Sequence, residues 1–327
     1  MKRKLLSAIV CAAMATTLLV GCGQKTETKA ETATATATDA KAETKDTASD
    51  KKVKVILITM DSTDQHWVSV DKGAQAAAAE LGNVEYKWMA PDKKDDAQQI
   101  ERINNAVADG ANAIMIAANG PDAITASLEE AKAAGVKIIY VDSPANSEAE
   151  ATFATDNKAA GKTAGEEMIK ALAAASKTDG KIGIVNINAS TASTVAREAG
   201  FREAFASSKF ELLETQYGEG DAAKSQDIAD NYITDGCVGI FGANEGATVG
   251  VGNAIKGAGG GIIGVGFDKS DAILSLIKDG SLVAAMSQNP DVMGSEGLKA
   301  AVKAIAGEKI TEKNVDTGVS VINKDSL

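Results

Sequence analysis

The stretch NAIMIAANGPDAITASLEEAKAAGVKIIYVD at residues 112–142 is the most informative about the fold, because its pattern returns later in the chain. Residues 238–268, VGIFGANEGATVGVGNAIKGAGGGIIGVGFD, again contain an apolar run, a polar residue, a helical pattern and a second apolar run. Asn119 and Asp142 mark the polar positions of the first stretch and lie 23 residues apart; the matching pair of the second stretch lies 24 residues apart. An internal repeat of this kind predicts two similar α/β lobes.

Short β-branched runs alternate with alanine-rich helical patterns from Val53 to the C-terminus. Val70, Ala74 and Ala77 recur at helical spacing after the first run. This alternation predicts right-handed crossovers and parallel sheets with helices on both faces, so the expected fold class is α/β with two doubly wound parallel-sheet lobes. The predicted strands lie near residues 53–60, 84–89, 113–117, 136–141, 182–187, 211–215, 238–242, 262–266 and 283–287.

The N-terminus has the three parts of a secretion signal. A basic start precedes an apolar run from Leu5 to Val20, and a small-residue junction follows the run. The sequence LVGC at residues 19–22 resembles the lipobox of bacterial lipoproteins, whose chemistry attaches a diacylglycerol to the cysteine. The resemblance implies a signal peptide over residues 1–21 and a lipid on Cys22, and therefore an extracytoplasmic protein anchored to the cell membrane. An ordinary signal peptide with an incidental cysteine is the alternative.

Residues 24–50 consist almost entirely of Thr, Ala, Lys, Glu and Asp, so they have no large apolar side chain to bury. We therefore predict a disordered tether over residues 22–52. The whole chain carries a net charge of -11, and loss of the three basic residues of the leader makes it -14. Such an acidic surface repels phosphate backbones, so nucleic-acid binding is not expected.

The cysteines and the histidine limit the chemistry of the chain. One cysteine leaves with the leader and Cys22 is the predicted lipid site, so Cys237 alone remains and is expected to be a buried core thiol without a disulfide. One histidine and no clustered cysteines argue against a metal site, and no other cofactor is expected. A hard cation held by Asp61, Asp64 and Asp142 is the alternative.

Polar residues close most of the predicted strands. Ligands bind at the carboxyl edge of a parallel α/β sheet, because loops converge and helix N-termini point there. Carboxylates accept hydroxyl protons, and amides both donate and accept, so such an edge suits a neutral molecule rich in hydroxyls. Helix capping is the alternative role for the same residue types. The strand-end residues are Asp61, Asn119, Asp142, Asn188, Asn244, Asp268 and Gln288.

Two of the few aromatic residues fall beside this edge. Trp67 opens the first helical pattern, and Phe267 directly precedes Asp268. A sugar ring has C–H faces as well as hydroxyl edges, so aromatic plates beside polar groups complement both. We therefore predict a sugar-sized, polyhydroxylated ligand.

Over residues 53–322 the chain resembles the ribose-binding-protein-like periplasmic solute-binding proteins of ABC importers. The segments HWVSVDKGA, VAREAGF, VGFD and SQNPD carry the resemblance. It implies a type I periplasmic binding protein fold, in which a three-segment hinge near Thr155, Asn289 and Asp316 joins the lobes. The implied N-terminal and C-terminal lobes are residues 53–155 with 289–316, and residues 156–288 with 317–327.

The resemblance also implies roles for individual residues. Trp67 matches the aromatic that stacks on the sugar, and Arg197 matches the guanidinium clamp. On the first loop, Asp61, Asp64 and His66 replace more neutral or aromatic residues and make the expected pocket more acidic; exposure to solvent or a capping role is the alternative for His66. The other matched ligand-binding residues are Asp142, Asn244, Phe267, Asp268 and Gln288.

Two departures from the family pattern argue against ribose itself. Ser143 stands where the family has an arginine, and Gly220 falls near an expected second-lobe aromatic. The expected function is capture of a pentose-like sugar or polyol by hinge closure and delivery to the permease of an ABC importer, by a monomer. A receptor for a furanosyl signal such as autoinducer-2 is the alternative.

An enzyme and a transcriptional regulator are the competing classes. The chain shows no nucleophile with an adjacent base and no paired acids with a stated task. The glycine-rich residues 257–266 lack the phosphate-loop and dinucleotide patterns. A regulator would need a DNA-binding head in place of the leader. We therefore expect a binding protein and not an enzyme.

Overall fold

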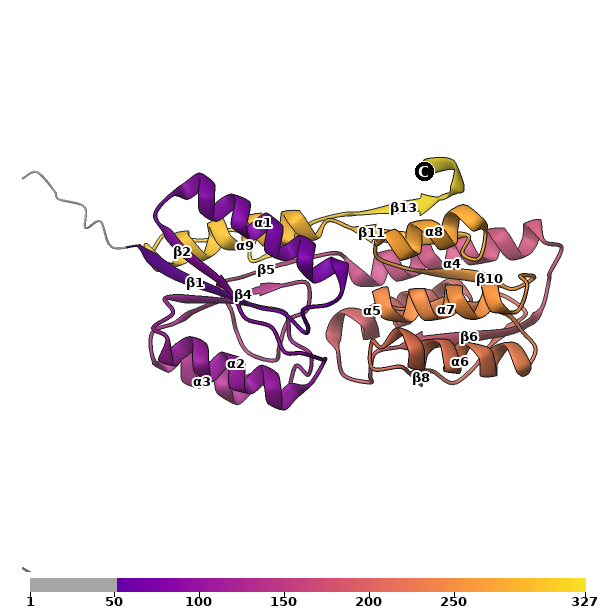
Figure 1. The fold of residues 1–327 in the computed structure, drawn as a ribbon, viewed down its shortest axis with the longest axis horizontal. Coiled ribbons are helices and arrows are strands. Elements are labelled where there is room, and N and C mark those ends of the chain that lie inside the picture. Colours follow the sequence, from indigo (N-terminus) through magenta and orange to yellow (C-terminus); the bar gives the residue numbers. More distant parts are fainter. Residues whose placement is uncertain (1–51) are drawn as a thin grey trace, which may run out of the picture. The chain divides into compact units, whose positions relative to one another are not determined.

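The computed structural model describes residues 52–327. The predicted signal peptide, the predicted lipid site at Cys22 and nearly all of the predicted tether lie outside the described residues. Among residues 52–327, no helix is both long enough and apolar enough to cross a membrane. Two largely parallel sheets with flanking helices organise this part of the chain (Figure 1).

The first sheet orders its strands β12-β5-β4-β3-β1-β2, and every pair in it is parallel. Apolar runs such as VKVILI form its central strands because parallel strands are buried on both faces. Its strands are β1 (Val53–Ile58), β2 (Val84–Trp88), β3 (Ala113–Ile116), β4 (Lys137–Val141), β5 (Ala151–Ala154) and β12 (Asn314–Asp316).

Side-chain alternation along the first sheet divides its core into two layers. The covering helices are α1 (Gln65–Leu81), α2 (Asp96–Ala108), α3 (Thr125–Ala133) and α9 (Pro290–Ile305). Val55 and Leu57 of β1 pack in one cluster with α1 and α9, whereas Ile56 and Ile58 pack in another with α2 and α3. Figure 1 shows the two helix pairs on opposite sides of the sheet.

The second sheet orders its strands β13-β11-β10-β9-β6-β7, with β8 also paired to β6. β13 runs antiparallel to β11, and the other pairs are parallel. The strands are β6 (Gly180–Asn186), β7 (Phe210–Leu212), β8 (Gln216–Tyr217), β9 (Cys237–Gly242), β10 (Ile263–Phe267), β11 (Ala284–Gln288) and β13 (Val319–Asn323). The helices are α4 (Asn157–Ala174), α5 (Ala192–Ala204), α6 (Ala222–Thr234), α7 (Glu245–Gly257), α8 (Asp271–Asp279) and a terminal 3-10 turn, Lys324–Ser326.

Local sequence signals set several helix ends. Asp95, Asp221 and Ser270 accept hydrogen bonds from backbone N–H groups at the starts of α2, α6 and α8. Gly82 and Gly280 end α1 and α8 in the left-handed conformation that glycine adopts without strain. The three N-caps follow strand ends and therefore lie at the carboxyl edges of the sheets, whereas the two glycines lead the chain back to the amino edges.

The chain crosses between the two sheets three times, after β5, after β11 and after β12. Side chains tie these segments together. Thr155 Oγ1 donates a hydrogen bond to Gln288 Oε1 at 2.9 Å, and Asn289 Nδ2 donates to the carbonyl of Thr317 at 2.7 Å. The predicted fold class of two α/β lobes with three connecting segments is therefore confirmed. The lobe boundaries near these segments stay a prediction, because they concern which residues move together.

The sequence patterns miss three strands, β5, β12 and β13. β5 and β12 have only four and three residues, and β13 alternates apolar with polar residues, so none has a long apolar run. The single strand predicted near residues 211–215 is instead two shorter ones, β7 and β8. One strand of the second sheet departs from the parallel arrangement: the last crossing brings β13 back antiparallel to β11.

Glycines let one helix pair in each lobe pack backbone against backbone. A Cβ atom at Gly73 of α1 would lie 2.0 Å from a backbone oxygen of α9, and one at Gly294 of α9 would lie 1.9 Å from a backbone oxygen of α1. α4 and α5 repeat this reciprocal arrangement through Gly161 and Gly200, at 2.0 and 1.9 Å. The repeat that the sequence indicates thus extends to the closest helix contacts of the two lobes.

Candidate ligand-binding site

A small cavity lies between the lobes, beyond the carboxyl ends of their strands. Its open volume is about 20 Å³, roughly the space of one water molecule. A ring-sized ligand therefore requires the lining side chains or the lobes to move apart. Most of the predicted ligand-binding residues line it, namely Asp64, His66, Trp67, Asp142, Arg197, Asn244, Asp268 and Gln288. Asp61 and Phe267 do not.

Asp142 and Asp268 occupy equivalent positions of the internal repeat, directly after β4 and β10. Both are non-glycine residues with positive φ, 63° and 76°. Each backbone N–H donates to a carbonyl of the neighbouring strand, Phe153 in one lobe and Met286 in the other, at 2.8 Å. Strained left-handed residues concentrate at functional sites, and here the strain directs two buried carboxylates from opposite lobes to one cavity.

His66 bridges these two carboxylates. Its Nε2 lies 3.1 Å from Asp142 Oδ2 in its own lobe, and its Nδ1 lies 3.6 Å from Asp268 Oδ1 in the other lobe. Burial works against the charged imidazole, but Asp268 and Asp142 outweigh burial and raise the pKa of His66 above its ordinary value. The ring also stands edge-on to Trp67, with the ring centroids 4.6 Å apart. His66 therefore lines the cavity, as one of its two sequence interpretations predicts.

Arg197 is buried on α5, where 2% of it is exposed. Its Nε donates to Asn157 Oδ1 at 2.8 Å, its Nη1 donates to the carbonyl of Ala243 at 3.0 Å, and its Nη2 lies 3.7 Å from Asp142 Oδ2. The guanidinium carbon stands 4.3 Å above the centre of the Phe267 ring. Two hydrogen bonds and the Phe267 ring thus fix the guanidinium at the cavity wall, with Asp142 as a nearby opposite charge.

The structure differs from the sequence prediction at Phe267. Its ring is fully buried in the core of the second lobe and supports Arg197 from below, so it does not form a wall of the cavity. A strand-end aromatic can face either side of the sheet, and here the alternation of β10 turns it toward α4. Asp268 likewise does not face Arg197 as a pair: it accepts from Gln288 Nε2 and approaches His66.

Asp61 and Asp64 hold a residue that the sequence analysis does not single out, Lys94. The Lys94 ammonium donates to Asp61 Oδ2 and, at 2.8 Å, to Asp64 Oδ2. Burial opposes the charge of Lys94, but Asp64 and Asp61 outweigh it, so its pKa is raised. A buried ammonium already sits between these carboxylates, which argues against the alternative of a hard cation there. Among residues 52–327, no group of three metal-binding side chains is assembled.

Four buried nitrogen atoms of residues that line the cavity have no hydrogen-bond partner among the described residues. They are His66 Nε2, which lies at ion-pair distance from Asp142, and Trp67 Nε1, Arg197 Nη2 and Asn244 Nδ2. A buried donor without an acceptor costs free energy, so such groups in a cavity indicate that a ligand supplies the acceptors. The carboxylates of Asp64 and Asp142 in the first lobe and of Asp268 in the second lobe line the same cavity and supply hydrogen-bond acceptors. The cavity can therefore bind a molecule that both donates and accepts hydrogen bonds.

The capping interpretation holds for part of the strand-end set. Asn188 accepts from the backbone N–H groups of Ser190 and Thr191, and Asn119 donates to Asp96, so both serve local structure and neither lines the cavity. Asn244 does both: its Oδ1 caps α7 at 3.3 Å, whereas its Nδ2 remains free at the cavity. Asp64 stands at the N-cap of α1 but makes no capping bond.

Glu245 is a second residue that the sequence analysis does not single out. It opens α7 in the second lobe, and its Oε2 accepts a hydrogen bond from the backbone N–H of His66 in the first lobe at 3.0 Å. Burial, together with the nearby charges of Asp64 and Asp268, raises the pKa of Glu245 to about 7. Burial is the main cause for Glu245, and the nearby charge of Asp268 contributes to the raised pKa values of both Glu245 and His66.

Raising the pH from 5 to 8 is expected to lower the free energy of unfolding. The pKa of Glu245 is raised from 4.5 to about 7, so its stabilising contribution is complete below about pH 4.5 and is lost as the pH rises through about 7. His66, whose pKa is also raised, loses its contribution above 6.5, with the same sign. Glu245 alone accounts for a decrease of up to about 3 kcal/mol in the free energy of unfolding. Urea titrations of the parent and of Glu245→Gln check this, and equal pH slopes in the two proteins would contradict it.

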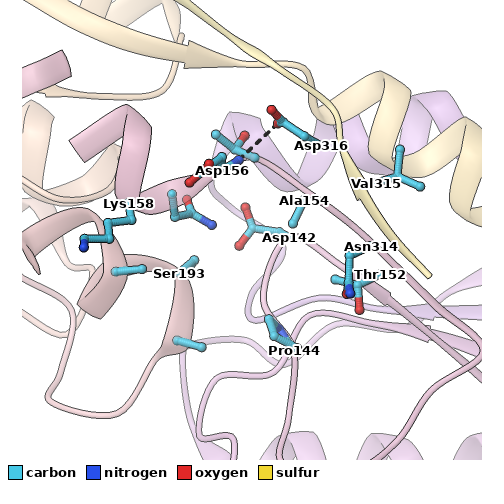
Figure 2. Close-up of a pocket in the computed structure, with 14 residues that line it drawn as sticks. Asp142, Pro144, Thr152, Ala154, Asp156, Lys158, Ser193, Asn314, Val315 and Asp316 are labelled. Carbon is cyan, nitrogen blue, oxygen red and sulfur yellow. Dashed lines mark hydrogen bonds between the residues drawn. The ribbon is translucent and has the colours of Figure 1, made fainter. Parts of the chain in front are cut away.

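A larger hollow of 410 Å³ lies on the hinge side of Asp142. Figure 2 shows Asp142 at the centre of the residues that line it, which come from β5, β12, α4 and α5. The backbone N–H of Asp156 donates to Asp316 Oδ1 at 3.1 Å across two of the hinge segments. Because both lobes and the hinge line this hollow, it offers room for relative motion of the lobes.

Cys237 lies in the core of the second lobe, as predicted, and among the described residues it forms no disulfide. Burial raises the pKa of its thiol to about 11, which makes it a poor nucleophile.

Comparisons with known proteins agree with this geometry. A model of the periplasmic binding protein domain family matches residues 53–309. The ribose import binding protein RbsB of Haemophilus influenzae is 29% identical over 262 residues, which are 79% of this chain and 87% of that protein. A solved ABC transporter solute binding protein from Agrobacterium vitis with bound D-fucose has a TM-score of 0.78 and 32% identity, over 83% of this chain and 96% of that chain. A carbohydrate transporter solute binding protein from Agrobacterium radiobacter in complex with D-arabinose has a TM-score of 0.80 and 30% identity, over 84% and 95% of the two chains.

Proposed function

This chain belongs to the periplasmic binding protein domain family, and we propose that it closes its two lobes around a neutral, polyhydroxylated ligand of sugar size. In this proposal it acts outside the cytoplasm as a monomer and delivers the ligand to the permease of an ABC importer. One observation carries the proposal: carboxylates and unpaired donors from both lobes face the same cavity. Such a set pairs with a ligand only when the lobes close on it.

The chemistry of the cavity favours hydroxyl groups over charged ones. Each hydroxyl donates one hydrogen bond and accepts others, so it can serve a carboxylate and an unpaired N–H at once. Trp67 provides an aromatic surface beside these polar groups, as the C–H face of a sugar ring requires. The carboxylates outnumber the fixed cations Lys94 and Arg197, which disfavours an anionic ligand. The carboxylates at or next to the cavity are Asp61, Asp64, Asp142, Glu245 and Asp268.

Thermal melting of the full chain with a ligand panel tests this function. The panel comprises D-ribose, D-arabinose, D-fucose, ribitol and the furanosyl signal autoinducer-2, with the anion D-arabinonate as a matched control. At a ligand concentration about 1,000 times Kd, binding adds about 4 kcal/mol to the stability of the folded state. We expect at least one neutral sugar to raise the melting temperature and D-arabinonate to leave it unchanged. A shift with autoinducer-2 alone would replace the sugar with that signal, and no shift at all would reject the proposal.

Substituting Cys22→Ser is expected to release the protein from the membrane. We propose that Cys22 carries a diacylglycerol, and the support is the lipobox-like sequence LVGC. One acyl chain gives only marginal membrane binding, whereas two give stable anchoring, so loss of both leaves a free protein. Fractionation of cells that express the parent or the variant measures this, with ligand-induced melting shifts as the control for folding. A variant that still fractionates with membranes would contradict the anchor.

A further inference from the structure

Lys94 lies at the cavity although it comes from the loop between β2 and α2, far in sequence from the other site residues. Only 6% of its side chain is exposed. Burying an ammonium costs several kcal/mol unless carboxylates accompany it. Asp61 and Asp64 form ion pairs with the Lys94 ammonium, so two acidic residues of the first lobe hold one cation at the cavity.

The two carboxylates have different tasks. Asp61 Oδ1 accepts from the backbone N–H groups of Thr63 and Asp64 and from the Thr63 hydroxyl, and its Oδ2 accepts from Lys94. Asp61 is thus fully occupied away from the cavity and acts as a positioning residue. Asp64 lines the cavity, does not cap its helix, and accepts only from Lys94 among the described side chains. Asp64 therefore keeps acceptor capacity for a ligand.

The second lobe leaves room for Lys94 through Gly220. A Cβ atom at Gly220 would lie 2.6 Å from Lys94 Cδ and 2.7 Å from its Cε. The φ of +73° at Gly220 disfavours any other residue as well. The carbonyl of Gly220 packs in turn against Gly246 in the first turn of α7, where a Cβ atom would lie 1.9 Å away. In the closed arrangement the backbone at Gly220 therefore packs against the Lys94 methylene groups, while Asp61 and Asp64 hold its ammonium.

An ammonium has three N–H donors, and the described residues accept two of them. The third remains for the cavity that Lys94 lines. We propose that Lys94 is a specificity-determining residue, which donates this hydrogen bond to one ligand oxygen while Asp64 accepts from a neighbouring hydroxyl. The inference rests on the proposed function and goes beyond it, because it selects ligands with two adjacent oxygens at this end of the site.

Lys94→Gln tests the proposal when it is combined with deoxy analogues. The probes are the sugar of the panel that binds the parent most tightly and each of its monodeoxy analogues, measured by calorimetry. Hydrogen bonds to charged groups are strong, so we expect the variant to bind the intact sugar about tenfold to a hundredfold more weakly. For the one analogue that lacks the oxygen bound by Lys94, parent and variant should bind equally.

The pattern across analogues separates a ligand contact from a structural role. If Lys94 only shaped the closed state, Lys94→Gln would weaken every analogue by the same factor, and that result would overturn the proposal. Lys87→Gln is the matched control, because Lys87 on β2 is half exposed and pairs with Asp109 away from the cavity; its affinities should equal those of the parent.

Two further outcomes are distinguishable. If Lys94→Gln does not fold, Lys94→Arg keeps the charge that Asp61 and Asp64 require but displaces the donor, so it should change the order of affinities within the sugar panel. An unchanged order would overturn the proposal. If the parent itself binds no sugar of the panel, the proposed function is wrong and this inference fails with it.

Discussion

Arg197→Met is expected to lower the free energy of unfolding by about 3–5 kcal/mol, the usual cost of removing one partner of a buried ion pair. The substitution keeps an unbranched side chain over the Phe267 ring. It leaves Asp142 with one fewer cationic neighbour and strips Asn157 Oδ1 and the carbonyl of Ala243 of their donor. Two buried acceptors without a donor, and a buried carboxylate that keeps only His66 as a cationic neighbour, account for the loss.

Urea unfolding of the parent, Arg197→Met and Lys162→Met measures this effect. Lys162 is a suitable control because it lies on α4 and pairs with Glu203 at the surface, where about half of its side chain is exposed. Its replacement should leave the midpoint unchanged, since exposed ion pairs contribute little. Equal midpoints for the two variants would show that Arg197 is not held as its contacts indicate.

Gly200→Ala is expected to lower the free energy of unfolding by about 3 kcal/mol, at the upper end of the usual cost of overpacking. The added methyl would lie 1.9 Å from a backbone oxygen of α4, so no side-chain rotation can relieve the clash. α4 and α5 would have to separate along their whole contact, which also moves Arg197 on α5. The ligand affinity should therefore fall together with the stability.

Gly257→Ala is the matched control for the helix-pair prediction. Gly257 ends α7, and a Cβ atom there would meet no atom within 4 Å. The same substitution should then stabilise the protein by about 0.4–1 kcal/mol through the lower entropy of the unfolded chain. Denaturant midpoints of the two variants should move in opposite directions, and a loss in both would show that helix contact is not the cause.

Much of the fold follows from the sequence because parallel strands and their helices have strong local patterns. The central strands are apolar throughout, as β1 shows, and the internal repeat by itself aligns Asp142 with Asp268. Position after a strand also brings most of the predicted residues to the cavity. Their geometry there, including the bridge that His66 forms, agrees with a ligand-binding edge, while their contacts with a ligand stay a prediction.

The remaining features depend on contacts that no local pattern encodes. In the sequence Lys94 is an ordinary loop lysine, and only the fold places Asp61 and Asp64 around it. Glu245 is likewise an ordinary acidic residue in a first helical turn, and only the fold places the backbone of His66 from the other lobe beside it. Phe267 precedes the site in sequence, yet its ring faces the core. Short strands such as β12 pair only because the hinge returns the chain to the first sheet.

The packing of α9 on α1 determines the order in which the lobes can complete their folding. The first sheet begins at Val53, but its core includes Met293 and Leu298, and the glycine contact of α1 needs Gly294. The lobe that emerges first from the ribosome therefore cannot close its core until nearly the whole chain has been synthesised. Contacts this distant in sequence slow folding, because loop closure must precede them. The second lobe, whose strands β6 to β11 are contiguous in the chain, can build most of its core from residues that are synthesised earlier.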